Sequence, residues 1–218
     1  MIPLSVVMKR RILIAAPLLA ALPLVVPSAR AAATDAASIA APVTALDRAL
    51  ITTMKSASAG ASFMTRYTAL KPVVEQSFNL PVILETSAGL LWSQIPPAQQ
   101  TELQTLFTQY TVASYISSFS GYGGQKFETL PGSRSVGASR VVTTDLVAPT
   151  GHKTKLAYVL SPAGSTWKIT DVLFEGTISK VATQRSDFGS LIEPGNATKL
   201  IAALKQKVTA LSGGALHG

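Results

Sequence analysis

The spacing of apolar residues changes around residues 121–124, and this change decides the fold class. Up to that point apolar residues recur every three or four positions, as on amphipathic helices. After it come four stretches that alternate or are rich in β-branched and aromatic residues, at about 125–130, 136–147, 154–161 and 166–175. Proline and glycine turn signals separate these stretches, as in antiparallel hairpins, and helical spacing returns after Gly176. Helices, then antiparallel strands, then helices again predict an α+β domain.

Proline and glycine positions also set the expected helix boundaries. Helices are predicted from Pro42 to about 58, from Phe63 to about 74, from Leu80 to Trp92, from Pro97 to Phe119, from Ile178 to Ile192 and from about 196 to 211. Pro42 is expected in a first turn, where its missing N–H costs nothing, and the alanine-rich residues 32–41 are expected to be frayed. The helix at 97–119 has an apolar face so broad that it needs contacts on two sides.

The first 31 residues have the composition of a secretory signal peptide. Lys9, Arg10 and Arg11 precede an apolar run, 12–26, that is short for a membrane span, and Ala-x-Ala sites follow near residue 31. The alternative is an uncleaved anchor. Cleavage would leave 15 basic and 11 acidic residues and lower the net charge from +8 to +4. Residues 32–218 are then expected to form a single domain in the periplasm, with no internal repeat or linker.

Composition excludes several classes of function. The chain has no cysteine, so a lipid anchor on cysteine, a disulfide framework and cysteine-liganded metals are ruled out. A net charge of +4 allows weak attraction to an anionic membrane surface but is too small and scattered to indicate nucleic acid. No histidine, aspartate or glutamate cluster has the spacing of a metal site, and no cofactor motif occurs.

No catalytic site is predicted. His152 lies in a turn and His217 in the tail, and no nucleophile motif is present. Asp171 and Glu175 are the best acid–base candidates, but four residues along a strand put them about 13 Å apart. Pairing with arginine is the simpler interpretation of these two carboxylates.

The aromatic residues are gathered in one part of the chain. All fourteen lie between Phe63 and Phe188. In the strand at 166–175, Trp167, Ile169 and Leu173 share one face at period two. Such a set either fills a core or walls a ligand cavity, and composition alone leaves both open.

Residues 78–126 and 167–207 resemble the MlaC (toluene-tolerance) family of periplasmic lipid-binding proteins. Positions that match the family pattern are Phe78, Gly89, Trp92, Pro97, Gln100, Phe107, Tyr110, Tyr115, Tyr122, Gln125, Trp167, Lys168, Asp171, Val172, Glu175, Gly176, Ser179, Arg185, Ser186, Phe188, Gly195, Ile201, Leu204 and Lys207. Their order and spacing are more specific than any one of them. The segments 78–86 and 181–188 are most similar to the hopanoid-associated HpnM branch.

The resemblance implies a mainly antiparallel, twisted sheet of four to five strands, packed against about six helices and enclosing an apolar cavity. It further implies a soluble, monomeric periplasmic carrier without a cofactor. Such a carrier would move a hopanoid or a phospholipid between the inner and outer membranes, dock on an inner-membrane transporter and touch membranes transiently. The alternatives are an isomerase or dehydratase on a cone-shaped α+β fold with a hydrophobic substrate, and an interaction module whose cavity is only core.

Fifteen residues are predicted to line the cavity, from the apolar faces of the helices and strands that would enclose it. They are Leu84, Leu91, Trp92, Leu106, Phe107, Tyr110, Tyr115, Ile116, Phe119, Tyr158, Leu160, Trp167, Ile169, Leu173 and Val181.

Overall fold

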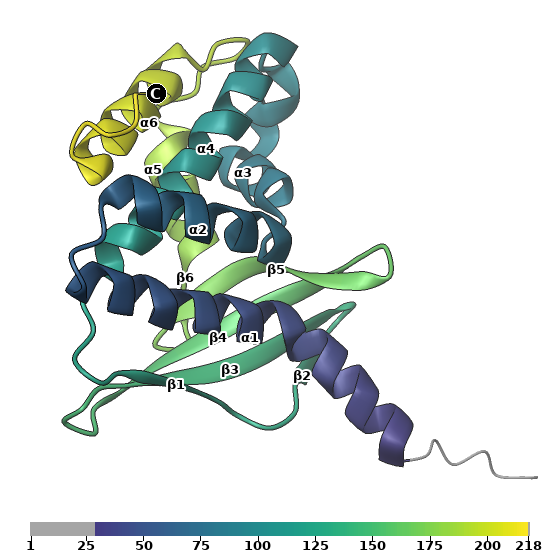
Figure 1. The fold of residues 1–218 in the computed structure, drawn as a ribbon. Helices are drawn as coiled ribbons and strands as arrows, with labels where there is room; N and C mark the ends of the chain where they lie inside the picture. The colour runs from purple at the N-terminus through teal and green to yellow at the C-terminus, as the bar shows by residue number, and fades with distance from the viewer. Residues whose placement is uncertain (1–28, 218) are drawn as a thin grey trace, which may run out of the picture.

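A computed structural model describes residues 29–217 and shows a layer of helices packed on an antiparallel sheet (Figure 1). In chain order the elements are α1 (Ala29–Ser58), α2 (Phe63–Ser77), α3 (Leu80–Ala88), the 3₁₀-helix η1 (Gly89–Gln94), α4 (Pro97–Ser118), β1 (Lys126–Thr129), β2 (Arg134–Val136), β3 (Ser139–Val147), β4 (Lys153–Ala163), β5 (Thr166–Phe174), β6 (Ile178–Ser179), α5 (Lys180–Gly189) and α6 (Thr198–Ser212). The predicted α+β class is confirmed.

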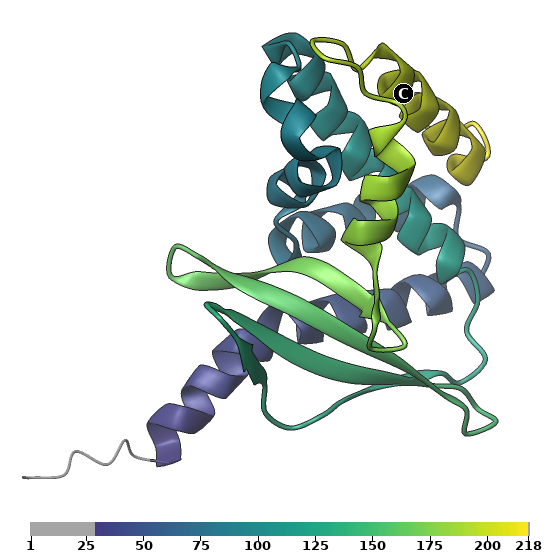
Figure 2. The same cartoon turned by 180° about the vertical axis from the view of Figure 1, so that it is seen from behind.

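The sheet is a simple antiparallel meander. Its order is β1-β3-β4-β5-β6, and the short β2 pairs with β3. The long strands β3, β4 and β5 correspond to the predicted runs, while β2 and β6 are too short to show a hydrophobic period. Figure 2 shows from behind how the twisted sheet lies below the helices and how α5 rises directly from β6.

A β-bulge in β5 changes which side chains share a face of the sheet. Val159 of β4 pairs with Asp171, and the next residue of β4, Leu160, pairs with Ile169, so Thr170 is an extra residue without a partner. Side chains alternate between faces only while the ladder is regular. The strand therefore presents Ile169 on the face of Tyr158, and beyond the bulge it presents Val172 there instead of Leu173.

The buried core lies between the helices and one face of the sheet. Its fully buried large side chains include Leu46 and Leu50 of α1, Leu70 of α2, and Leu200 and Leu204 of α6. Helix α4 packs against α2, α3 and α6, and α1 crosses the sheet over β5, β3 and β1. The two-sided cover predicted for the helix at 97–119 is thus present.

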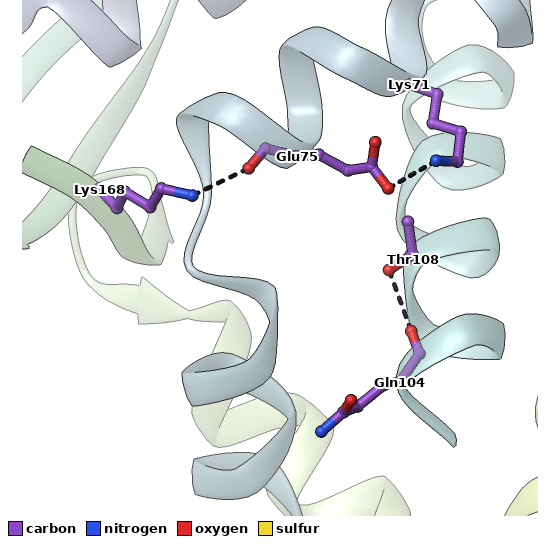
Figure 3. A network of polar contacts seen from close by, with 5 residues as sticks. All are labelled: Lys71, Glu75, Gln104, Thr108 and Lys168. Atoms are coloured by element: carbon purple, nitrogen blue, oxygen red, sulfur yellow. Dashed lines mark hydrogen bonds and ion pairs between the residues drawn. The ribbon is translucent and has the colours of Figure 1, made fainter. Parts of the chain in front are cut away.

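Polar contacts fix the end of α2 to the sheet (Figure 3). The Nζ of Lys168 in β5 donates to the backbone carbonyl of Glu75 at 3.1 Å, where a cation suits the C-terminal end of a helix. The side chain of Glu75 accepts a bond from Lys71 at 2.6 Å, one turn earlier. Just beyond the helix, Phe78 forms a bridge with Ile169, and the N–H of Asn79 donates to the Ile169 carbonyl at 2.9 Å. The α2–α3 connection is thereby anchored on β5.

Three predicted helices have wrong boundaries. The helix predicted from Ile178 to Ile192 is shorter, because Ile178 and Ser179 form β6 and α5 spans Lys180–Gly189. Residues 32–41 are not frayed, because α1 begins at Ala29 and runs through Pro42, and Ile39 is already buried in the core. A proline inside a helix removes one backbone bond and bends it, and Figure 1 shows α1 bent along its length. The helix predicted from Leu80 to Trp92 ends at Ala88, since Gly89 has a φ of 69°. Most of the predicted signal peptide, residues 1–28, lies outside the described residues.

Candidate functional site

A cavity of about 470 Å³ lies between α4 and the sheet. The end of α2, α3 and α5 close its sides, and β3, β4 and β5 form the opposite wall. Its volume is in the range of small-molecule sites, and the side chains that line it are mostly apolar or aromatic.

One face of α4 supplies a full wall of the cavity. The lining positions on this helix recur every three or four residues: Phe107, Tyr110, Thr111, Ser114, Tyr115 and Ser118, with Phe119 just after its end. Large aromatic rings thus alternate with small polar side chains, and the small ones leave the space that becomes the cavity. The opposite face of α4 is ordinary core, formed by Leu103, Leu106, Val112, Ala113 and Ile116.

Aromatic rings form a continuous line along this wall. The ring centroids of Phe78 and Tyr115 are 5.8 Å apart, those of Tyr115 and Phe119 are 6.1 Å apart, and those of Phe119 and Phe127 are 6.0 Å apart. Rings at such distances attract one another beyond the effect of burial. Phe78, Tyr115 and Phe119 line the cavity, and Phe127 continues the line of rings to β1.

The sheet supplies the opposite wall through two cross-strand pairs. Tyr158 of β4 pairs with Val172 of β5, and Leu156 pairs with Phe174, and all four line the cavity. The bulge at Thr170 is the reason that Val172 and Phe174 point there. On the α5 side, Val181 and the buried Gln184 complete the wall, and Gln184 accepts a bond from Ser87 of α3 at 3.3 Å.

The carboxylate of Asp171 lines the cavity but is occupied by structural hydrogen bonds. Its Oδ1 accepts from the backbone N–H groups of Val172 at 2.8 Å and Val181 at 3.1 Å. Its Oδ2 accepts from the hydroxyl of Ser179 at 2.5 Å, and Ser179 itself caps α5. Asp171 therefore fixes the start of α5 against β5, as an N-terminal anchor does.

A second carboxyl group lies behind the cavity wall. Asp47 of α1 is only 5% exposed. Its Oδ2 accepts a long 3.5 Å bond from Thr129, and its Oδ1 has no partner among the described residues. Burial raises the pKa of this carboxyl from 3.8 to about 7, and the nearby hydroxyl groups of Thr129, Thr144 and Tyr158 offset part of that rise.

Two tyrosines connect Asp47 to the cavity. Burial raises the pKa of Tyr115 and of Tyr158 well above the usual value for tyrosine, and the nearby carboxyl of Asp47 raises both further. Both rings line the cavity. Both therefore stay neutral at physiological pH, with Asp47 behind their rings.

Six of the fifteen predicted lining residues surround the cavity: Phe107, Tyr110, Tyr115, Phe119, Tyr158 and Val181. The other nine are placed elsewhere, and they are Leu84, Leu91, Trp92, Leu106, Ile116, Leu160, Trp167, Ile169 and Leu173. Leu84, Leu106, Ile116, Leu160 and Ile169 are core residues, because the helices and the adjoining part of the sheet pack tightly around them. Leu91, Trp92 and Trp167 are half-buried beside the core.

Leu173 has a different reason for missing the cavity. It pairs with Ala157, so the bulge places it on the face of the sheet opposite to Tyr158. The lining residues that the sequence did not indicate are Phe78, Leu80, Ile83, Thr111, Ser114, Ser118, Leu146, Thr154, Leu156, Asp171, Val172, Phe174, Ile178, Lys180, Thr183 and Gln184. For Thr111, Ser114 and Ser118 the signal was available, since they continue the spacing of Phe107 along α4.

Other kinds of site are not found in the part of the chain that the structure describes. Between residues 29 and 217 no three histidine, aspartate or glutamate side chains come together in a way that could hold a metal ion. No helix in this range is both long and apolar enough to span a bilayer. His152 is exposed in the β3–β4 turn and does not line the cavity.

The fold and the site together define a class: an α+β protein with an apolar, aromatic-walled cavity between helix α4 and the sheet. Comparison with protein families places the chain within that class. The family model described as MlaC protein matches residues 45–206, so the chain belongs to the MlaC family.

A solved structure of similar fold is the phospholipid-binding protein from Ralstonia solanacearum, determined in complex with a phospholipid. The two chains share 20% identity with a TM-score of 0.69, and the match covers 80% of this chain and 99% of the other. The comparison with curated proteins gave no match.

Proposed function

We propose that this protein is a periplasmic lipid carrier that holds the apolar part of one lipid in the cavity. The observation that carries the proposal is the cavity itself, about 470 Å³ between α4 and the sheet, with walls of aromatic and aliphatic side chains. A close-packed interior leaves few voids larger than a water molecule, so a space of this size with mostly apolar walls supports the binding of an apolar ligand.

The energetics suit a carrier. A lipid that removes on the order of 500 Å² of apolar surface from water gains roughly 12 kcal/mol before costs, at about 25 cal/mol per Å². The entropy lost when the lipid and the side chains become ordered offsets a large part of this gain. The remaining affinity holds a lipid in water and still allows its release to a membrane.

The ligand is a hopanoid or a phospholipid. The Ralstonia solanacearum protein, which has this fold, was solved with a phospholipid, while segments 78–86 and 181–188 are most similar to the hopanoid-associated branch of the family. On this proposal the protein works as a monomer, receives or delivers its lipid at an inner-membrane transporter and shuttles between the two membranes.

The role is binding without catalysis. The alternative of an enzyme with a hydrophobic substrate relied on Asp171 as its acid or base. Both oxygens of that carboxylate accept structural hydrogen bonds, from Val172, Val181 and Ser179. A general base needs a free oxygen within reach of the substrate proton, so this arrangement favours a carrier.

The test is identification of the bound lipid. Protein purified from the periplasm without detergent is expected to show a lipid-sized adduct in native mass spectrometry, which organic extraction removes and identifies. Ser114→Trp fills the cavity from α4 and should reduce the adduct at least tenfold. Ser117→Trp is the matched control, because Ser117 is exposed on the same helix outside the cavity. A clean apo mass with no uptake from labelled vesicles would refute the proposal.

A further inference from the structure

Two exposed apolar side chains stand side by side at the rim of the cavity. Phe174 ends β5, Ile178 begins β6, and the two are cross-strand partners. Both line the cavity, yet Phe174 is 50% exposed and Ile178 is 56% exposed. Exposed apolar side chains that continue into a binding cavity mark a surface that another body covers.

The turn between β5 and β6 holds this pair in place. Glu175 and Gly176 have φ angles of 52° and 73°, as in a type I′ hairpin turn. The N–H of Thr177 donates to the Phe174 carbonyl at 3.2 Å. Within residues 29–217, Glu175 is the one non-glycine residue with positive φ, which costs about 1–2 kcal/mol. Strain of this kind is retained where the local shape has a use.

Two lysines border the same turn. The Cδ of Lys155 lies 3.2 Å from the place where a Cβ on Gly176 would stand, so its aliphatic stem runs along the turn. Lys180, at the start of α5, lines the cavity opening. Both side chains are exposed, and neither has an ion-pair partner in the described part of the chain. Together with Glu175 they give the rim one net positive charge.

We propose that this rim, made of Phe174, Ile178, Lys155 and Lys180, docks on the surface of an anionic lipid bilayer. The proposal rests on the proposed carrier function and adds to it the surface and the partner. Apolar side chains with lysines beside them match an interface of acyl chains and negative headgroups. Docking would set the cavity opening against the bilayer, so that a lipid tail passes between the two apolar phases without crossing water.

Vesicle flotation of the whole mature protein tests this docking. The probes are vesicles of phosphatidylcholine alone and of phosphatidylcholine with a quarter phosphatidylglycerol. Phe174→Ser/Ile178→Ser is expected to reduce the fraction bound to the anionic vesicles about tenfold. Val136→Ser is the matched control, because Val136 is 46% exposed on β2 and does not line the cavity. It should bind as the wild type does.

The charge part of the rim is tested separately. Lys155→Glu/Lys180→Glu is expected to lower binding to anionic vesicles at least threefold and to leave the weaker binding to phosphatidylcholine nearly unchanged. If the double serine variant shows no thermal unfolding transition, Ile178→Ser alone carries the test, with an expected loss of threefold or more.

The outcomes separate the docking proposal from the function beneath it. Equal binding of the rim variants and the wild type, or no binding of the lipid-loaded wild type to either vesicle, overturns the docking surface and points to a protein partner. Native mass spectrometry of the same samples reports on the function independently. The carrier proposal is overturned if the wild type never holds lipid. A wild type that carries lipid, together with rim variants that no longer bind vesicles, supports both the carrier function and the docking surface.

Discussion

Asp47 lies in the interior between α1 and the sheet, where hydroxyl groups surround its carboxyl but no cation of the described residues pairs with it. A buried carboxylate without a cation is costly, so the folded state prefers the neutral acid. Asp47 also stands directly behind Tyr115 and Tyr158, whose rings wall the cavity. Its charge therefore affects both the stability of the fold and the back of the binding site.

The raised pKa of Asp47 predicts that the protein loses stability as pH rises. The folded state keeps the proton up to about pH 7, while the unfolded chain releases it near 3.8. The contribution of Asp47 to the unfolding free energy is therefore highest at low pH, falls between about pH 4 and pH 7, and stays constant above pH 7. Asp47→Asn removes this dependence and should stabilise the protein at pH 8 by up to about 4 kcal/mol, at about 1.4 kcal/mol for each pKa unit.

Urea unfolding at pH 5 and pH 8 measures this effect. The difference in unfolding free energy between the two pH values should shrink in Asp47→Asn. Asp187→Asn, an exposed position on α5, should keep the difference of the wild type. A wild type that is equally stable at both pH values, or an Asp47→Asn variant less stable than the wild type at pH 8, would contradict the buried, neutral state described for Asp47.

The burial of Asp47 could not be predicted from the sequence. It lies on a helix beside the apolar residues Val43, Leu46 and Leu50, and a lone acid on such a helix is ordinarily solvated. Its burial arises because α1 crosses the sheet beside β1 and β3, and such a crossing depends on tertiary packing. Whether a segment forms a helix or a strand, by contrast, could be predicted from the local spacing of its apolar residues.

The two faces of helix α4 have different roles. One face packs in the core and the other walls the cavity, although both read as apolar stripes. The sequence therefore indicated that both faces of α4 are covered. It could not indicate which face packs in the core and which face borders the cavity. Ile116 was assigned to the cavity for this reason and lies in the core, 1% exposed.

The two faces of α4 predict opposite results for one substitution. Ile116→Trp forces bulk into a packed interior and should lower the unfolding free energy by about 1–3 kcal/mol. Ser114→Trp places the same ring in the cavity and should change stability little while lipid loading falls. Thermal unfolding of both variants, freed of lipid, gives the comparison. A strongly destabilised Ser114→Trp would mean that the cavity is closed in solution.

The sheet shows why strand patterns predicted the site less well than the fold. Period-two spacing placed Trp167, Ile169 and Leu173 on one face. That inference holds only for an uninterrupted ladder, and Thr170 interrupts it. Thr170 is a common strand residue, so its type gave no warning. The strand, its direction and its partners were predictable, while the face presented beyond the bulge was not.

The cavity couples lipid binding to the stability of the folded protein. A ligand that binds only the folded state stabilises it by RT ln(1 + [L]/Kd), about 2.7 kcal/mol at a hundredfold excess over Kd. Protein with its lipid should therefore melt several degrees above protein from which the lipid has been extracted. Scanning calorimetry on both forms measures the shift.

The cavity-filled variant is the internal control for this shift. Ser114→Trp has little room for lipid, so its melting temperature should hardly respond to extraction, while Ser117→Trp should behave as the wild type does. Identical melting temperatures for loaded and extracted wild type would show that the cavity contents contribute nothing to the folded state.

The bulge at Thr170 has a consequence for how this chain can diverge. Residues before and after it belong to two different alternation frames, so the loss of one residue at that point would exchange inward and outward positions over half of β5. Point substitutions can only resize the cavity wall, whereas a single insertion or deletion there replaces it. An alignment of relatives should therefore treat 166–169 and 171–174 as separate blocks, with any gap placed at 170.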